Sequence, residues 1–404
     1  MSKLADGIKK ITDKINEIKI IRIITGNKHV RRILRAIFTI AFFIFLGLFI
    51  NEVAVQPYLL RKSLEKAREL YGYGEAETMD ISDHSDSSDG SIPGKNGSGD
   101  NMNPGYDTGN DPYGTNNGQT GPDSGAPAST PDPNRDDKGR LKKFSKLLEV
   151  NEDVKGWIRI TNIKTGKIDT KVDYVVVQSP DKSDPDFYLS RNWATKDYLK
   201  AGSIFLDVAS SVENNSKNLI IHGHNMTSSD NMFHYLLEYK DDIKFLKEHP
   251  IIRFDTIYEE ALWKIFAVYI TPGNNDKGDF FPFTTAEFKS DKDFIEFIYQ
   301  TRLRSFYYMD SVDINENDQI LTLSTCSYEL PNYRLVIVAR KVREGEDSTV
   351  DTSVFKKKKS SERLYPQSFY DHYGGKPPEI LPFDEAVEKG LVPWYKPNDS
   401  VGDE

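Results

Sequence analysis

The residues best able to do chemistry are a cysteine, two histidines and an arginine, each beside an apolar segment typical of a strand. Cys326, the only cysteine among 404 residues, follows LTLST, and Arg334 opens RLVIVARKV eight residues later. His222 and His224 flank a glycine in NLIIHGHNM. A lone cysteine is most often a small buried apolar residue, but a neighbouring imidazole can turn it into a thiolate nucleophile. The grouping therefore favours nucleophilic catalysis.

The two histidines allow three interpretations: a metal site, a base or ion-pair partner for the thiol, and a structural role. The glycine between them permits a tight turn from which one imidazole can project beyond the strand. A metal needs a third ligand, and the candidates lack diagnostic spacing; they are Asp207, Asp230 and His234. We favour pairing of a histidine with Cys326 and predict no metal.

Arg334 gains a role if its strand pairs antiparallel with the strand that ends at Cys326. Its guanidinium would then lie beside the thiol and could hold a substrate carbonyl or a developing oxyanion. The alternative is an ordinary arginine at a sheet edge. Arg340 and Arg343, further along the same segment, fit a structural role better.

The elements that must position these residues read as a mainly β fold with helical insertions. Helices are expected at residues 141–151, 231–248 and 286–305. Eight short β-rich segments separated by turn signals predict strands, and strands of this number and size suggest a closed or nearly closed barrel. They are residues 157–161, 172–178, 202–207, 218–222, 251–256, 262–270, 319–325 and 334–342.

The N-terminal part predicts a membrane anchor. Residues 1–35 carry ten Lys and Arg against three Asp and Glu, a net charge of +7, so the overall −9 leaves −16 for the rest. Residues 36–56 are apolar and just long enough to cross a bilayer. A cleaved signal peptide is the alternative, but its basic lead-in is normally much shorter. The basic residues place residues 1–35 in the cytoplasm and the remainder outside the cell.

The rest of the chain divides by composition. Residues 57–71 predict a short helix, and residues 72–138 form an acidic linker rich in Ser, Gly and Pro, too poor in apolar residues to fold. Such a linker spans on the order of 45 Å and could tether the next domain at a distance from the membrane. Residues 139–345 form the predicted catalytic domain. The extension at 346–404 could fold over the site, but we favour docking on the barrel or disorder.

Three motifs in this order resemble a known family. They are GHNM, then TLSTC about 100 residues later, then RLVIVA eight residues after the cysteine. The set resembles the sortases, cysteine transpeptidases of Gram-positive cell surfaces. The segments VNEDVKGWIRI and DYVVVQSPD, together with the helix expected at 286–305, are similar to class B. The resemblance covers residues 141–343, about half of the chain.

The resemblance implies an eight-stranded sortase-type β-barrel with His224, Cys326 and Arg334 as catalytic residues. His222 would be a groove or structural residue, and the expected substrate contacts are Ser324, Thr325 and Asn225. Cys326 would cleave a sorting signal of NPQTN or LPxTG type after its Thr through a thioacyl intermediate. An amine of a peptidoglycan cross-bridge or a pilin lysine would then accept the acyl group. No cofactor and no nucleic acid are implied.

Two alternatives remain for the activity. The first is a thiol peptidase outside the cell that releases surface proteins to water. The second is a wall-binding module without catalysis. The residues alone do not decide between anchoring and pilus polymerisation, nor which sorting motif or amine is preferred.

Overall fold

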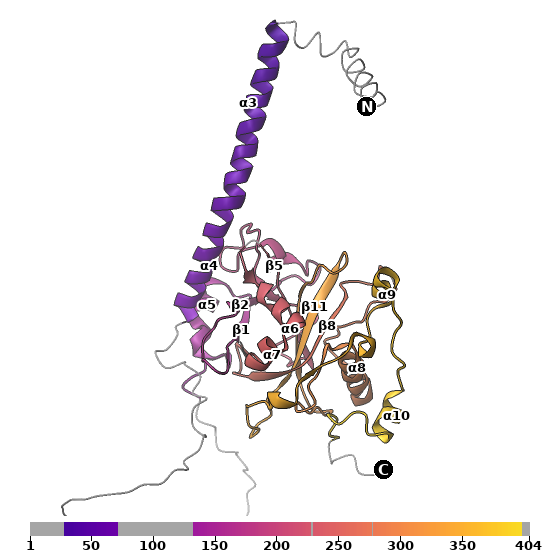
Figure 1. Cartoon of the computed structure of the whole chain (residues 1–404). Coiled ribbons are helices and arrows are strands. Elements are labelled where there is room, and N and C mark those ends of the chain that lie inside the picture. Colours follow the sequence, from indigo (N-terminus) through magenta and orange to yellow (C-terminus); the bar gives the residue numbers. More distant parts are fainter. Residues whose placement is uncertain (1–27, 72–131, 228, 277, 398–404) are drawn as a thin grey trace, which may run out of the picture.

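The structure is a computed structural model that describes residues 28–71, 132–227, 229–276 and 278–397. A long N-terminal helix ends on a β-barrel, and shorter helices and loops cover the barrel (Figure 1). The predicted linker at 72–138 lies outside the described residues as far as residue 131, and so does most of the predicted basic tail, residues 1–27.

Eight strands close into the predicted barrel, in the order β1-β2-β3-β4-β10-β11-β8-β7. Each expected segment corresponds to one of them, with ends that move by a few residues. They are β1 (Val154–Ile160), β2 (Asp173–Gln178), β3 (Ile204–Leu206), β4 (Asn218–His222), β7 (Ile251–Thr256), β8 (Leu262–Pro272), β10 (Ile320–Cys326) and β11 (Tyr333–Lys341). Short two-stranded pairs are formed by β5 (Asn225–Met226) with β6 (Asn231–Met232), and by β9 (Tyr307–Tyr308) with β12 (Lys356–Lys357).

The barrel mixes parallel and antiparallel pairs, and the mixture decides which strand ends meet. β4 and β10 run parallel, with His222 in register with Ser324. β10 and β11 run antiparallel over seven residue pairs. Parallel neighbours end at the same edge of a sheet, whereas an antiparallel neighbour begins where the other ends. The end of β4, the end of β10 and the start of β11 therefore lie together.

The strands around this edge are buried on both faces. Leu321, Leu323, Leu335 and Ile337 have no exposed surface, and neither does Thr322 on the alternate face of β10. Strands buried on both faces read as nearly continuous apolar runs, as RLVIVA does. Burial of each such aliphatic side chain stabilises the folded state by about 1.5–3 kcal/mol relative to leaving it exposed. The edge thus projects from a rigid core.

The helical insertions are shorter than the sequence predicts. α8 (Asp291–Arg304) begins at Ser290, whose hydroxyl accepts a hydrogen bond from the backbone N–H of Asp293 and so caps the helix. The helix expected at 231–248 is broken into β6, a 3₁₀ turn (His234–Leu237), α6 (Glu238–Asp241) and α7 (Ile243–Glu248). The break falls at Asp242, which is extended and caps α7 through the N–H of Lys244. The helix expected at 141–151 is a 3₁₀ turn (Lys142–Phe144) and α5 (Ser145–Val150).

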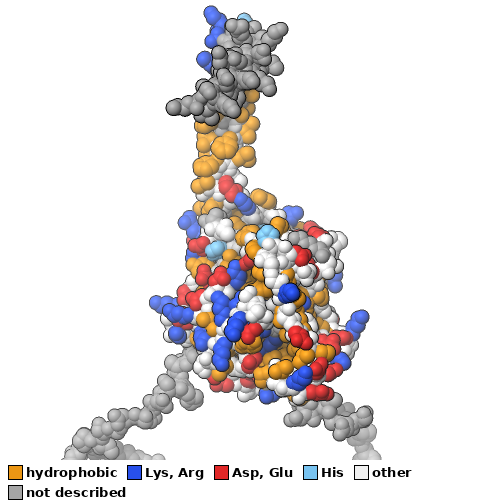
Figure 2. Space-filling view, turned by 45° about the vertical axis from the view of Figure 1, so that its right-hand side comes forward, with side chains coloured by type: hydrophobic (Ala, Val, Ile, Leu, Met, Phe, Trp, Pro, Cys, Tyr) orange, Lys and Arg blue, Asp and Glu red, His pale blue; other side chains and the backbone are white. Residues whose placement is uncertain are grey.

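The predicted membrane span lies within one continuous helix. α3 (Lys28–Ile50), a π-helical turn (Asn51–Val55) and α4 (Gln56–Tyr71) follow one another without a break. By length and composition this helix could cross a membrane, and no side chain of α3 is buried. Figure 2 shows apolar side chains covering the helix above the barrel, whereas the barrel surface carries mixed charges. The finding is consistent with the predicted anchor.

The juxtamembrane helix α4 packs directly on the barrel. The ring of Tyr71 stacks on Trp157 with centroids 4.3 Å apart, and its hydroxyl donates to Asp255 over 3.0 Å. Arg68 forms a 3.1 Å ion pair with Asp173. Arg135 also contacts the barrel, because its guanidinium donates a hydrogen bond to the carbonyl of Tyr258. Described residues before and after the segment 72–131 are therefore in contact with the barrel. The predicted tether lies outside the described residues as far as residue 131, and in the described part α4 connects the apolar helix directly to the barrel.

The C-terminal extension is docked on the barrel through residue 397. β12 pairs with β9, and the side chains of Phe355 and Trp394 are buried. α9 (Gln367–Tyr373) lies by the ends of β8 and β11, and α10 (Phe383–Glu388) lies beside α8 (Figure 1). Of the alternatives considered for the extension, the described part therefore shows docking.

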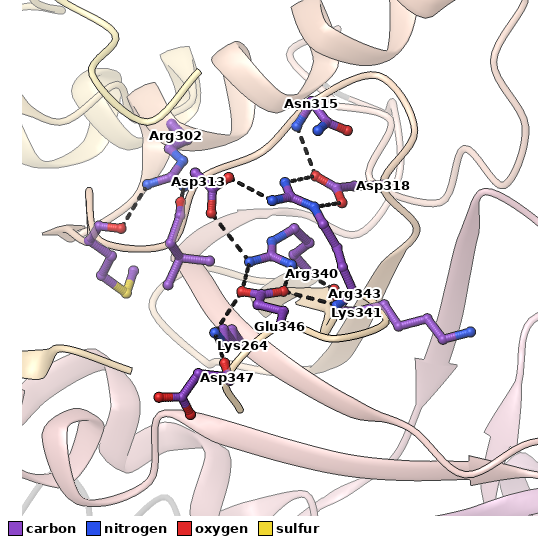
Figure 3. A network of polar contacts seen from close by, with 12 residues as sticks. Lys264, Arg302, Asp313, Asn315, Asp318, Arg340, Lys341, Arg343, Glu346 and Asp347 are labelled. Carbon is purple, nitrogen blue, oxygen red and sulfur yellow. Dashed lines mark hydrogen bonds and ion pairs between the residues drawn. The ribbon is translucent and has the colours of Figure 1, made fainter. Parts of the chain in front are cut away.

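An ion-pair network joins the start of the extension to the far end of β11 (Figure 3). The guanidinium of Arg340, whose side chain is fully buried, binds both carboxylate oxygens of Glu346 over 2.6 Å. Lys264 on β8 binds the same carboxylate over 2.6 Å. The structural role expected for Arg340 and Arg343 fits this environment. The other members of the network are Arg343, Asp313 and Asp318.

We expect Glu346→Gln to lose stability in a pH-dependent way. Burial raises the pKa of Glu346, but hydrogen bonds from Arg340 and Lys264 outweigh burial and hold it at about 2, below the ordinary 4.5. Because the folded-state pKa is depressed, the ion pair stabilises fully above pH 4.5 and is lost as the pH falls toward 2. The variant should be less stable by about 1–2 kcal/mol at pH 7, allowing for solvent screening.

Urea unfolding from pH 7 to pH 3 measures this effect, and the gap between wild type and variant should shrink steadily below pH 4.5. Glu344→Gln, an exposed position two residues away, is the matched control and should show no gap. A gap for Glu346→Gln that stays constant down to pH 3 would contradict the assignment.

Candidate active site

Cys326 and Arg334 face each other across two neighbouring strands. They are register partners, at the last residue of β10 and the second residue of β11. Directly opposed residues of an antiparallel pair project from the same face with Cβ atoms about 4.5–5.5 Å apart. Both residues are half-buried at the edge of the barrel. The antiparallel pairing on which the predicted role of Arg334 depends is therefore present.

Two features of neighbouring elements hold Arg334 in place. The carbonyl of Tyr333 accepts a hydrogen bond from its guanidinium over 3.3 Å. Gly273, just after β8, lies against it, and a Cβ at this glycine would come within 3.0 Å of the guanidinium carbon and 2.9 Å of the Asn332 side-chain oxygen. Sequence reasoning missed Gly273, because an isolated glycine after a strand carries no sign of what approaches it.

His224 reaches the site from the turn after β4. Gly223 is required there, since a Cβ would lie 2.4 Å from a methyl carbon of Ile204 and 2.8 Å from the ring of Phe233. Nε2 of His224 lies 2.8 Å from the carbonyl oxygen of Leu189. A carbonyl can only accept, so Nε2 carries the proton and Nδ1 is the basic atom of the neutral ring.

The pKa of His224 is lowered from its usual 6.5. Burial lowers it most, the hydrogen bond to the Leu189 carbonyl raises it, and the positive charge of Arg334 lowers it further. The imidazole is therefore neutral at pH 7 and can accept a proton. Because the charge of Arg334 lowers the pKa of His224, the two side chains interact electrostatically.

His222 is separated from this group by its own partner. Its Nε2 lies 2.9 Å from a carboxylate oxygen of Asp207. Burial raises the pKa of Asp207, but the hydrogen bond and charge of His222 outweigh it, so the net shift is downward. The environment fits the structural role expected for His222. Another potential metal ligand, Asp230, lies 3.4 Å from His234, so these donors form separate pairs.

The residues expected to contact substrate are buried, and two of them bind backbone carbonyls of the site. Asn225 is 5% exposed; its amide donates to the carbonyl of Cys326 over 2.9 Å, and its oxygen accepts from Nδ1 of His234 over 2.7 Å. Thr325 is 2% exposed and donates to the carbonyl of Gly223 over 2.8 Å. Ser324 is also 2% exposed. The hydrogen bonds of Asn225 and Thr325 fit a positioning role, whereas the buried hydroxyl of Ser324 has no hydrogen-bond partner among the described residues.

The loop between Cys326 and Arg334 has a strained backbone. Tyr328 and Asn332 both adopt a left-handed conformation with φ of 64°, which costs on the order of 1–3 kcal/mol for residues other than glycine. Tyr328 is 64% exposed, and its hydroxyl donates to the carbonyl of Asn225 over 3.3 Å. Burial and the nearby Cys326 raise the pKa of Tyr328, while Arg334 lowers it. Tyr328 thus stands at the site, where the sequence gave no sign of it.

The chain is similar in sequence to proteins of a known family. The family model "Sortase domain" matches residues 167–342. Sortase B of Listeria monocytogenes is 34% identical over 202 residues, which cover 50% of this chain and 73% of that protein. The chain belongs to the sortase family. Sortases are cysteine transpeptidases, so the resemblance seen in the motifs is confirmed.

Two further proteins are similar to this chain. Sortase B of Staphylococcus aureus is 29% identical over 203 residues, covering 50% of this chain and 75% of that protein. The crystal structure of Clostridium perfringens sortase B is 29% identical, with a TM-score of 0.43, and the match covers 49% of this chain and 99% of that one. The family match ends at Val342, before the docked extension.

We expect Arg334→Gln to raise the pKa of His224. A neutral side chain no longer opposes the imidazolium charge, while burial persists and keeps the value below 6.5. NMR titration of ring-labelled histidine measures the shift. Lys146→Gln removes the same charge from an exposed position in α5 and should leave His224 unchanged. An unchanged or lower pKa in Arg334→Gln would show that the two side chains do not interact.

Asn225→Ala should weaken both stability and turnover. It removes the side chain that binds the Cys326 carbonyl and Nδ1 of His234, which lowers the free energy of unfolding by about 1–3 kcal/mol. A displaced nucleophile should lower kcat by about 10- to 100-fold. Unfolding and peptide-cleavage assays on Asn225→Ala and on Asn315→Ala, remote from the site, check this. Equal kcat for the two variants would argue against the positioning role of Asn225.

Proposed function

We propose that this sortase is a membrane-anchored transpeptidase that uses Cys326, His224 and Arg334. It cleaves a sorting-signal pentapeptide after Thr and transfers the surface protein to an amine of peptidoglycan or of a pilin. The observation that carries the proposal is the register of Cys326 with Arg334, beside a strand whose end supplies His224. This register supports the roles of a thiol nucleophile, a base and an oxyanion partner at one edge of the barrel.

The acylation step follows from the chemistry of these groups. Neutral His224 accepts the proton of the Cys326 thiol, and the thiolate sulfur attacks the carbonyl carbon of the Thr. Arg334 stabilises the negative charge on the carbonyl oxygen. When the tetrahedral intermediate collapses, the C–N bond breaks and the imidazolium gives its proton to the leaving amine. Its lowered pKa makes the imidazolium a good proton donor.

The deacylation step runs through the same groups in reverse. The acceptor amine attacks the thioester carbon, and His224 removes a proton from it. The C–S bond breaks, a new amide forms, and the proton returns to the sulfur of Cys326. Asn225 and Thr325 keep the Cys326 backbone in place throughout, since their bonds do not involve the reacting atoms.

The proposed setting is the outer face of a Gram-positive membrane. The basic residues Lys28, Arg31, Arg32 and Arg35 precede the apolar run of α3, which favours a cytoplasmic N-terminus and an extracellular barrel. α4 holds the barrel directly at the end of this helix. The active edge therefore works close to the membrane, where substrates that are themselves attached to the membrane can reach it.

The acceptor dependence of the product tests this function. The full-length protein in detergent is incubated with a fluorogenic NPQTN- or LPxTG-type peptide, with and without an amine such as triglycine or diaminopimelate. We expect an amide product that appears only with the amine, and no product with Cys326→Ala. Cleavage to the acid alone, regardless of amine, would instead identify a thiol peptidase. Full activity in Cys326→Ala would exclude a cysteine mechanism and favour the wall-binding alternative.

In the same assay, Arg334→Lys distinguishes the effect of the positive charge at this position from the effect of the planar guanidinium group. Lysine keeps the charge but loses the planar fork, and loss of an oxyanion donor lowers kcat by about 10²- to 10³-fold. Arg343→Lys, the same exchange in the distant ion-pair network, should retain kcat. Equal activity of the two variants would remove Arg334 from the mechanism.

A further inference from the structure

The loop that joins the two strands, residues 327–332, is held by its own backbone hydrogen bonds to Tyr333 and by contacts from outside the strands. It carries the left-handed residues Tyr328 and Asn332. Such a backbone persists only where its surroundings fix it. Because the loop follows Cys326 directly and is separated from Arg334 only by Tyr333, its shape bears on where the thiol and guanidinium lie.

Glu329 is a loop residue that contacts elements outside the two strands. Its carbonyl accepts a 2.8 Å hydrogen bond from the hydroxyl of Tyr373, at the end of α9 in the C-terminal extension. Its carboxylate forms an ion pair with Lys240 of α6. Two elements that are far apart in sequence thus hold backbone and side chain of one loop residue.

α9 makes a second tie at the base of the loop. The hydroxyl of Ser368 lies 2.5 Å from that of Tyr333, and the Ser368 backbone N–H donates to Asp279 over 2.8 Å. The carbonyl of Tyr333 accepts from the guanidinium of Arg334. The extension therefore contacts the residue that precedes the proposed oxyanion partner.

The contacts within the extension give α9 a firm base. The rings of Tyr365 and Phe369 stack with centroids 4.1 Å apart and an angle of 10°. The Tyr370 hydroxyl accepts from the N–H of Tyr365 and donates to the carbonyl of Arg363. These contacts all lie beyond residue 342, where the family match ends.

We propose that α9 is a clasp that fixes the loop at 327–332, with Tyr373 and Ser368 as positioning residues for Cys326 and Arg334. This inference rests on the proposed transpeptidase function and assigns the extension a part in it. Tyr373 and Ser368 touch no reacting atom; they act by holding Glu329 and Tyr333. The extension is thus a component of the active site.

Tyr373→Phe in the full-length protein tests the clasp, because it removes only the hydroxyl. Tyr395→Phe is the matched control, since it removes a hydroxyl of the same extension that binds Glu316, near α10. We expect amide hydrogen exchange of residues 327–333 to become about ten-fold faster in Tyr373→Phe and to stay unchanged in Tyr395→Phe. Ser368→Ala should produce the same effect.

Kinetics then test whether the clasp matters for catalysis. kcat for the sorting peptide should fall by about five- to ten-fold in Tyr373→Phe, with KM within about two-fold and the thermal midpoint within about 2 °C of wild type. Unchanged exchange, or faster exchange with unchanged kcat, would overturn the proposal. Exchange needs no turnover, so a failed clasp is distinguishable from a failed function, which full activity in Cys326→Ala would reveal.

Discussion

The parallel pairing of β4 with β10 places a histidine turn and a cysteine at one edge of the barrel, and the chemistry depends on it. Had these strands been antiparallel, His224 and Cys326 would lie at opposite ends. Parallel neighbours cannot be joined by a tight turn and need a crossover connection; here the segment between β4 and β10, which includes β7 and β8, makes it. β11 then returns antiparallel from the same edge and brings Arg334 opposite the thiol.

Much of this could be predicted from the sequence, because the strands are strongly patterned. RLVIVA and NLIIH are typical of buried strands, and the lone cysteine and the HGH turn lie at strand ends. What the sequence did not predict were one local helix cap and several features set by distant contacts. The break in the insertion after His224 follows from an aspartate cap at Asp242. The burial of Ser324, Thr325 and Asn225, expected to meet substrate, depends on how three strand ends pack together.

The contacts around the barrel could not be predicted from the sequence. Tyr71 stacks on Trp157, and Arg135 binds the Tyr258 carbonyl. The span and barrel are therefore joined by α4. Similarly, the polar composition of the extension gave no sign that Phe355 and Trp394 are buried or that α9 reaches the catalytic loop. These aromatic residues show no periodic pattern in the sequence, so their contacts could not be inferred from it.

The central claim is that Cys326 forms a covalent acyl intermediate at this edge. Intact-protein and peptide mass spectrometry after mixing the full-length protein with a sorting peptide, without amine and with an acid quench, tests it most directly. The account predicts an added mass equal to the peptide segment that ends at Thr, located on Cys326, sensitive to hydroxylamine and lost on addition of amine. Peptide cleavage with no adduct, or with an adduct on another residue, would contradict it.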